Sequence, residues 1–166
     1  MTHEEAVAFI RDAVAADGIQ YWADLGCGNG TFTRALVELL PADSHVTAVD
    51  RQKQDLRTAG ADFIRADFEK DQLELSDLDG ILIANALHYV AYKDALVRKL
   101  EHLFADTPRF IIIEYDTDRS NPWVPYPLSF KNLKSLFGGM GYRNIEKVNE
   151  RRSTYGSGRM YCALVE

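Results

Sequence analysis

The stretch Trp22-Ala-Asp-Leu-Gly-Cys-Gly-Asn-Gly30 decides the fold of this chain. Its apolar start ends in Asp24, and glycines follow at alternate positions, Gly26, Gly28 and Gly30. A glycine has no β-carbon, so the backbone can approach a ligand closely or adopt a positive φ without steric penalty. A helical pattern comes next and would place its positive N-terminal end beside this loop. The stretch therefore predicts a cofactor site in an α/β protein.

Strand patterns and helix patterns alternate along the rest of the chain. Strands are predicted at residues 21–25, 45–50, 62–66, 78–84, 109–114, 142–149 and 160–165. Helices are predicted at residues 2–16, with Thr2 as N-cap, and at residues 31–40, 51–59, 92–104 and 129–137. Because the last two strands have no helix between them, the pattern predicts an open, mostly parallel α/β sheet that closes with a hairpin. We expect residues 1–166 to form a single domain without a separate substrate domain.

The composition is that of an ordinary globular protein, with 46% hydrophobic and 27% charged residues. No apolar run approaches the ~20 residues that a membrane-spanning helix needs, and the N-terminal residues lack a signal-peptide pattern. We therefore expect a cytoplasmic protein that does not contact a membrane. With only Cys27 and Cys162, the sequence predicts no disulfide framework and no metal site. We interpret Cys27 as filling a small-residue position and Cys162 as a buried strand residue.

The charge is distributed unevenly along the chain, whose net charge is −6. Residues 1–118 hold 11 Lys and Arg against 22 Asp and Glu, whereas residues 119–166 hold 8 against 3. The acidic balance argues against nucleic acid as a partner, and we expect no DNA substrate. The simplest interpretation of the uneven distribution is a solvated surface. The sharper hypothesis is that the C-terminal third receives an anionic substrate.

Acidic residues follow the first three predicted strands, as Asp24, Asp50 and Asp67. In open α/β sheets, ligands bind outside the carboxyl ends of the strands. Asp50 lies 20 residues beyond Gly30, the spacing at which a carboxylate meets ribose hydroxyls. Thr31 stands where a dinucleotide fingerprint requires glycine or alanine, and the chain is too short for a second mononucleotide half. The pattern favours an adenosine cofactor that carries no pyrophosphate.

Four segments resemble the motifs of the class I S-adenosylmethionine-dependent methyltransferases. Residues 24–30 resemble motif I, Val49-Asp50 the second motif, Asp67-Phe68 the adenine-side motif, and residues 83–89 the fourth. The resemblance covers nearly the whole chain. It implies a Rossmann-like fold with a seven-stranded, mostly parallel sheet, a C-terminal antiparallel hairpin and helices on both faces. It also implies S-adenosyl-L-methionine as cofactor, S-adenosyl-L-homocysteine as product, and a transferase of class EC 2.1.1.-.

The resemblance assigns cofactor contacts to the residues that match these motifs. Asp24 would lie near the methionine amino group, with the glycine loop under the methionine part. Asp50 would accept hydrogen bonds from the ribose hydroxyls, and Asp67 from the adenine amino group. The Phe68 N–H would bond a ring nitrogen, while its side chain could stack on the base or belong to the core. The Asn85 carbonyl would face the methionine ammonium. The implied set is Asp24, Gly26, Gly28, Gly30, Asp50, Asp67, Phe68 and Asn85; taken singly, each could instead serve only a tight turn or a helix cap.

The methyl acceptor is expected above the fourth and fifth strands. His88 is a candidate base, because histidine is the side chain that most often transfers protons in enzymes, while Glu114 and Tyr115 could orient an acceptor. The alternatives are a structural histidine at a turn, and capping or surface roles for the other two. The loop at residues 115–128 could form the wall of an aromatic or apolar pocket through Trp123 and Tyr126. An anionic group could be held by Arg119, Arg151 and Arg152.

The leading hypothesis is a methyltransferase acting on oxygen or nitrogen of a small metabolite, with an anionic one favoured by the charge pattern. Alternatives are methylation of a protein or RNA, a non-catalytic S-adenosylmethionine-binding partner subunit and, more distantly, a nicotinamide oxidoreductase. Residues 85–88 do not match the Asn/Asp-Pro-Pro-Tyr/Phe pattern of amino-methylating enzymes, which lowers the expectation of DNA further. Because only about 20 residues precede the first strand, we expect no large N-terminal lid. Either the acceptor site is open, or the loop at 115–128, the first helix, a homodimer or a partner subunit closes it.

Overall fold

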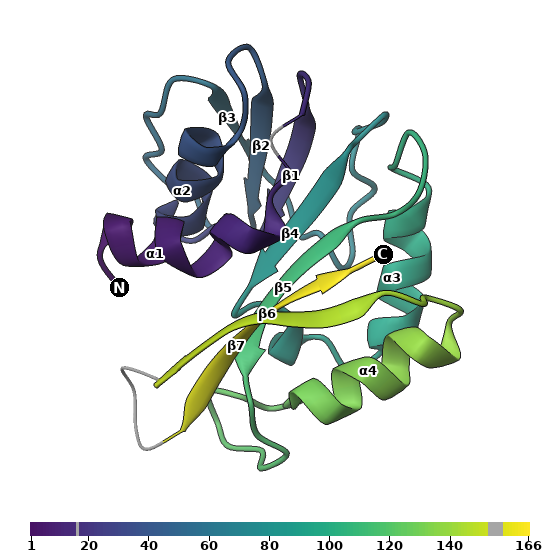
Figure 1. The fold of residues 1–166 in the computed structure, drawn as a ribbon. Coiled ribbons are helices and arrows are strands. Elements are labelled where there is room, and N and C mark those ends of the chain that lie inside the picture. Colours follow the sequence, from purple (N-terminus) through teal and green to yellow (C-terminus); the bar gives the residue numbers. More distant parts are fainter. Residues whose placement is uncertain (16, 153–157) are drawn as a thin grey trace.

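One seven-stranded sheet organises the molecule, in the order β3-β2-β1-β4-β5-β7-β6 (Figure 1). The computed structural model describes residues 1–15, 17–152 and 158–166. The strands are β1 (Tyr21–Leu25), β2 (His45–Asp50), β3 (Ala61–Arg65), β4 (Gly80–Ala84), β5 (Phe110–Tyr115), β6 (Ile145–Arg152) and β7 (Arg159–Val165). Strands β1 to β5 pair in parallel, whereas β7 runs antiparallel to β5 and β6. The predicted fold class, including the closing hairpin, is confirmed.

Helices cover both faces of the sheet (Figure 1). The helices are α1 (His3–Ile10), α2 (Thr31–Leu39), α3 (Lys93–Glu101) and α4 (Phe130–Gly139), with short 3-10 turns at Arg11–Ala13 and Leu87–Tyr89. The first two pack on one face and the last two on the other. Strand order reverses between β1 and β4, so the segments that follow these two strands run in opposite directions along the sheet. The crevice between these segments, at the carboxyl ends of the strands, is where ligands bind in such sheets.

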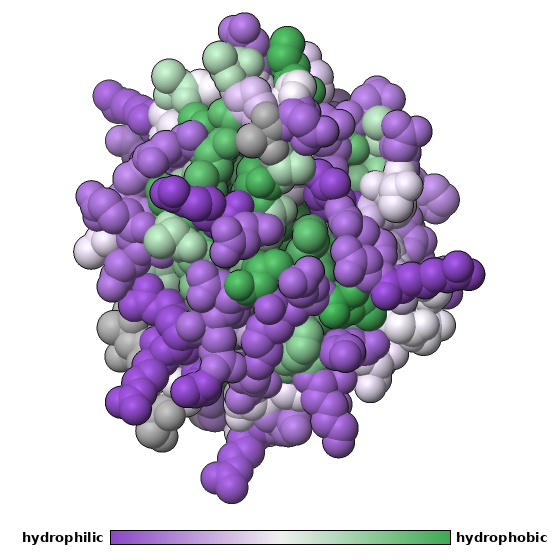
Figure 2. Space-filling model, viewed as in Figure 1, coloured by the Kyte–Doolittle hydropathy of each residue, from purple (hydrophilic) through white to green (hydrophobic). Residues whose placement is uncertain are grey.

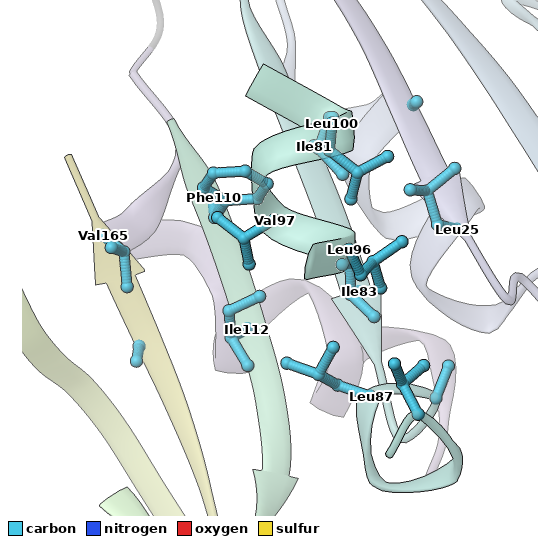
Figure 3. Packing of buried hydrophobic residues seen from close by; sticks show 14 of the residues in the cluster. Leu25, Ile81, Ile83, Leu87, Leu96, Val97, Leu100, Phe110, Ile112 and Val165 are labelled. Carbon is cyan, nitrogen blue, oxygen red and sulfur yellow. The ribbon is translucent and has the colours of Figure 1, made fainter. Parts of the chain in front are cut away.

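Branched residues of β4 and β5 form the centre of the core beneath α3. Val97 of α3 lies against Phe110, and Leu96 lies near Ile83 (Figure 3). Full burial of each such side chain contributes about 1.5–3 kcal/mol to folding. On the opposite face Trp22 is fully buried under α1 and α2. Both faces of the strands are therefore apolar, as expected for central parallel strands.

Two predicted helices differ from those in the structure. Residues 51–59 form no helix: the Gln52 N–H donates to Asp50 Oδ1 at 2.8 Å, and Leu56 is the only large apolar side chain available for packing. A segment that cannot bury an apolar face gains too little to form an isolated helix. The first helix ends at Ile10 rather than residue 16: a 3-10 turn follows at Arg11–Ala13, and Val14 has extended backbone with φ −99° and ψ 116°.

The boundaries of α4 and of the hairpin also shift. The predicted stop at Gly138-Gly139 is wrong by two residues, because α4 includes both glycines and the chain turns at Gly141, whose φ is +102°. Strand β6 starts three residues later than predicted, at Ile145, and extends to Arg152. The face shown in Figure 2 is mostly hydrophilic, with smaller apolar patches between polar side chains. In the part of the chain that the structure describes, no helix is long and apolar enough to cross a membrane.

Candidate active site

The glycine loop packs against the turn that follows β4. A β-carbon at Gly26, whose φ is +78°, would approach the Ala86 β-carbon to 2.5 Å. Gly30 is the left-handed N-cap of α2, and a β-carbon there would overlap the Leu56 side chain. Glycine is needed at both positions because the turn requires a positive φ and a neighbouring chain lies too close for a side chain. The glycine loop therefore presents backbone without side chains at these two positions beside the carboxyl ends of β1 and β4.

The N–H groups of this loop bond to the protein itself. The Gly26 and Cys27 N–H groups donate to the Val49 carbonyl at 2.8 and 3.1 Å, and the Gly28 N–H donates to Asp50 Oδ2 at 2.9 Å. The sequence-based expectation that they approach a ligand is therefore not met at these three positions. A pyrophosphate cradle needs several N–H groups aimed at the ligand. The arrangement agrees with a cofactor that carries no pyrophosphate.

A cavity of about 270 Å³ runs along the carboxyl ends of β1 to β4, and we call it the cofactor cleft. Six of the predicted cofactor residues line it, namely Gly26, Gly28, Asp50, Asp67, Phe68 and Asn85. Asp67 Oδ1 accepts a hydrogen bond from the Glu69 N–H at 3.1 Å. The Phe68 N–H has no acceptor among the residues that the structure describes. The Phe68 side chain both lines the cleft and packs on the core, so the two alternatives for it are compatible.

Asp24 lies in a second cavity of about 380 Å³, the Asp24 cavity, which continues from the glycine loop on the α2 side. Asp24 Oδ2 accepts from Thr33 Oγ1 at 2.6 Å, while Oδ1 is buried and has no hydrogen-bond partner in the described chain. Burial is the main reason that the pKa of the Asp24 carboxyl is raised to about 7; the hydrogen bond from Thr33 acts against this shift, and the nearby Asp50 charge adds to it. An unpartnered buried carboxylate oxygen is costly, so it favours a cationic ligand group.

Asn85 connects the cavities. Its φ of +51° is unusual for a residue other than glycine, and its Oδ1 atom is buried without a hydrogen-bond partner among the described residues. Its N–H donates to the Ile113 carbonyl at 2.8 Å, which fixes the strained backbone at the end of β4. Asn85 lines the cofactor cleft, the Asp24 cavity and a third cavity described below. Strained backbone held by its surroundings is typical of functional sites.

The third cavity, of about 850 Å³, opens beside Asn85 and is called the Trp123 cavity. His88 lines it but is only 2% exposed, and its Nδ1 atom lies 2.7 Å from Glu114 Oε2. The His88 N–H also donates to Glu114 Oε1 at 3.0 Å. Glu114 is fully buried, so it contacts His88 rather than a ligand. When the Nδ1–H group donates its hydrogen bond to the Glu114 carboxylate, Nε2 is the ring nitrogen that can accept a proton.

The other predicted acceptor-site residues divide between lining and supporting positions. Tyr115 lines the Trp123 cavity with its ring centroid 5.8 Å from that of His88, and Arg119 lines it too. Tyr126 does not line it; its N–H donates to the His88 carbonyl at 3.0 Å and so holds the loop in place. Neither Arg151 nor Arg152 lines the cavity among the described residues, and Arg151 instead pairs with Glu5 of α1 at 3.3 Å. The structure therefore does not bring this arginine pair to the Trp123 cavity.

Two lysines that support the site were not predicted. Lys99 of α3 donates to the carbonyls of Phe68, Glu69 and Asp71 at 3.1, 3.1 and 2.5 Å, beneath the turn that carries Asp67. Its place on an amphipathic helix gave no sequence signal. Lys93 is nearly buried and donates to the carbonyls of Val90 and Tyr126 at 2.8 and 2.9 Å, and burial lowers its pKa. A cation in the first turn of a helix opposes the helix dipole, so the position of Lys93 could have indicated from the sequence that this lysine has a structural role.

The cysteines match their sequence-based interpretation. Burial raises the pKa of the Cys27 thiol to about 12, with the nearby Asp24 and Asp50 charges adding to the shift, so the thiolate nucleophile is not available near neutral pH. Cys162 is fully buried in β7. Among the described residues, no three His, Cys, Asp or Glu side chains form a group that could hold a metal ion.

The fold and the cavities define a Rossmann-like protein with a nucleoside-binding cleft at the carboxyl edge of its sheet. The model of the methyltransferase domain family matches residues 23–109, which are 87 of the 166 residues. The chain therefore belongs to this family, the class I S-adenosylmethionine-dependent methyltransferases, whose cofactor is S-adenosylmethionine. No curated protein sequence matches the chain.

Solved structures share the fold at low sequence identity. Human N-acetylserotonin methyltransferase in complex with S-adenosylmethionine matches with a TM-score of 0.70 and 19% identity, over 96% of this chain and 51% of that one. An S-adenosylmethionine-dependent methyltransferase from Aquifex aeolicus matches with 0.70 and 16%, over 98% and 90%. The 1,6-didemethyltoxoflavin-N1-methyltransferase of Burkholderia thailandensis matches with 0.74 and 18%, over 99% and 77%. This chain spans about half the length of the human enzyme.

Proposed function

We propose that this protein transfers a methyl group from S-adenosylmethionine to an oxygen or nitrogen atom of a small metabolite. The observation that carries the proposal is the meeting of the cofactor cleft and the Trp123 cavity at Asn85, beside the buried His88–Glu114 pair. The sheet spans residues 21–165, and we propose that residues 1–166 act as one domain. An enzyme needs both a donor site and an acceptor site that share one boundary, and the cavities supply that arrangement.

The cofactor fits the unsatisfied groups of the site. We assign the methionine ammonium to a position near Asp24 Oδ1 and Asn85 Oδ1, because both oxygens are buried and have no hydrogen-bond partner in the described chain. Asp50 would hold the ribose hydroxyls: each of its oxygens accepts one N–H, and a carboxylate has lone pairs for more. Asp67 and the Phe68 N–H would hold the adenine edge. Bound S-adenosylmethionine supplies a methyl group that is already activated on a sulfonium.

The chain's own residues have to position the acceptor and take its proton. We propose that His88 Nε2 receives the proton of an acceptor hydroxyl or amine, while Glu114 acts as the positioning residue that fixes the ring and balances its positive charge. Methyl transfer forms the bond from acceptor to carbon and breaks the carbon–sulfur bond. That electron pair returns to sulfur, which leaves neutral S-adenosylhomocysteine. Tyr115 would border the acceptor beside His88.

The named relatives support a small acceptor without deciding it. The human and Burkholderia proteins are named for N-acetylserotonin and 1,6-didemethyltoxoflavin, which are both small molecules. Their identity to this chain is 19% and 18%, so the likeness establishes the fold and not the substrate. The enclosed position of His88, only 2% exposed, also favours a small molecule over a folded macromolecule.

Release of S-adenosylhomocysteine across a broad metabolite panel tests the proposal. We expect turnover with at least one small acceptor, and we expect His88→Gln to lower kcat at least about 100-fold, in the range of general-base catalysis, with cofactor Kd unchanged. Glu114→Gln should lower kcat and shift its pH profile, which loss of packing alone would not do. Cofactor binding without turnover of any small molecule would instead support a partner subunit or a macromolecular acceptor. Equal losses of kcat and cofactor affinity in His88→Gln would make His88 structural.

A further inference from the structure

The Trp123 cavity has a charge opposite in sign to that of the whole chain. The chain carries −6, yet Arg119 and Arg159 line the cavity, and no Asp or Glu does so among the described residues. Behind the lining, Glu114 is fully buried and engaged by His88, and Glu150 pairs with Arg159. A recess that concentrates positive charge within an acidic protein favours an anionic ligand.

Arg119 is the second feature of the cavity that favours an anion. Its guanidinium makes no ion pair with any residue that the structure describes, whereas Arg159 pairs with Glu150. The neighbouring Asp118 accepts a hydrogen bond from Asn132 Nδ2 at 2.8 Å and not from Arg119. A guanidinium presents a planar fork of donors that matches the oxygens of a carboxylate or a phosphate. Arg119 is therefore the group best placed to hold an anion at this cavity.

Trp123 supplies an apolar surface in the same cavity. Its side chain is 77% exposed, although its backbone is fixed: the Trp123 N–H donates to Asn121 Oδ1 at 2.9 Å. Val124 is buried beside it and donates to the Asn121 carbonyl at 3.1 Å. The indole therefore projects from a turn whose backbone is held in place. A planar ring is the partner that buries most of an indole face.

On the basis of the proposed function, we propose that the methyl acceptor is a planar molecule with an anionic group, its ring stacked on Trp123 and its anion paired with Arg119. The reacting oxygen or nitrogen then lies toward His88, at the inner end of the cavity. The arginine fork accepts both carboxylate and phosphate, so the test separates these two groups. The Trp123–Arg119 pair selects the acceptor, while His88 serves the reaction.

Equilibrium binding to protein saturated with S-adenosylhomocysteine tests this proposal without turnover. The probes are 4-hydroxybenzoate and phenyl phosphate as planar anions, 4-hydroxybenzamide as the neutral planar analogue, and 4-hydroxycyclohexanecarboxylate as the non-planar anion. We expect one planar anion to bind at least about tenfold more tightly than both the amide and the cyclohexane, measured by calorimetry. The anion that binds more tightly shows whether the acceptor's anionic group is a carboxylate or a phosphate. Equal affinity for the amide and the anions, or no binding by any probe, would overturn the proposal.

Substitutions assign the two selective contacts. Arg119→Gln should remove the preference for the anion over the amide, and Trp123→Ala the preference for the planar anion over the cyclohexane, with the Kd for S-adenosylhomocysteine unchanged. Arg152→Gln and Tyr92→Ala are matched controls, because both side chains are exposed and lie outside the cavity lining. Wild-type preferences in both Arg119→Gln and Trp123→Ala would overturn the assignment. If the probes bind with these preferences but no panel acceptor is methylated, the proposed function fails and the Trp123 cavity remains a binding site for a planar anion. Methylation of neutral, non-planar acceptors alone would support the proposed function and overturn the inference that the acceptor is a planar anion.

Discussion

The substitution Gly80→Ala is expected to destabilise the protein, although alanine is usually better than glycine inside a strand. Gly80 of β4 pairs directly with Trp22 of β1. A β-carbon at Gly80 would lie 2.5 Å from Trp22 Cε3 and closer still to Cζ3 and Cη2. Carbon atoms pack at about 3.5–4.0 Å, so the indole would have to move by roughly 1 Å.

The indole has no room for such a movement. Trp22 is fully buried, and its Nε1–H donates to Gln20 Oε1 at 2.9 Å. The Gln20 amide is itself held by the Ala15 carbonyl at 2.8 Å. Overpacking of a core costs about 1–3 kcal/mol, whereas replacing a strand glycine by alanine gains about 0.5–1 kcal/mol. We therefore expect a net loss of about 1 kcal/mol in the free energy of unfolding.

Urea unfolding of Gly80→Ala, Gly138→Ala, Trp22→Phe and the double variant Trp22→Phe/Gly80→Ala measures this effect. Gly138→Ala is the control, because Gly138 lies within α4 and a β-carbon there meets no atom within 4 Å; it should gain about 0.5–1 kcal/mol. Trp22→Phe removes ring atoms that the new methyl group would contact, so Trp22→Phe/Gly80→Ala should lose less than the sum of the single losses. Unchanged or increased stability in Gly80→Ala would refute the steric argument.

Three further predictions concern the cofactor site. Asp50→Ala should weaken S-adenosylmethionine binding by at least ~1.5 kcal/mol in calorimetry, as expected for lost hydrogen bonds to a charged group; an unchanged Kd would remove the ribose assignment. The pKa of Asp24 is about 7 in the folded protein against an ordinary 3.8, so folded protein keeps a proton that the unfolded chain releases. Between these pH values the stability of the ligand-free protein should therefore fall as pH rises, by at most ~1.4 kcal/mol per unit, and Asp24→Asn should lack this component. Parallel pH profiles of the two proteins would contradict it. Lys99→Met should raise cofactor Kd and leave acceptor KM unchanged, because Lys99 holds the turn of Asp67 through three carbonyls; Lys70→Met, whose ammonium lies 3.7 Å from Asp67, is the milder control. Equal effects of both lysine substitutions would refute the role of that turn.

Local sequence patterns were enough to predict most of the fold. The strand at residues 21–25 and that at 45–50 were predicted with the observed bounds, because each is a short apolar run bounded by turn or acidic residues. The helix predicted at 51–59 failed for the opposite reason. Its residues have helical propensity but no apolar face, and Asp50 captures the N–H of Gln52. Propensity decides little where tertiary contacts do not support it.

The candidate site divides along the same line. The positions of Asp24, Asp50 and Asp67 after their strands follow from the sequence, because parallel strands bring their carboxyl ends to one edge. The pairing of His88 with Glu114 does not, since 26 residues separate them and β5 brings them together.

The sequence by itself determined the class of cofactor, because the glycine loop and the carboxylates act through spacings within single strand-to-turn segments. Only the tertiary structure decided which of the predicted arginines Arg119, Arg151 and Arg152 lines the Trp123 cavity. Arg119 and Arg151 are chemically the same residue, but the loop after β5 places Arg119 at the cavity, and β6 carries Arg151 to α1, where Glu5 pairs with it. The physical reason is that charge acts through space over a few ångströms, and chain topology, not sequence distance, sets which charges come that close.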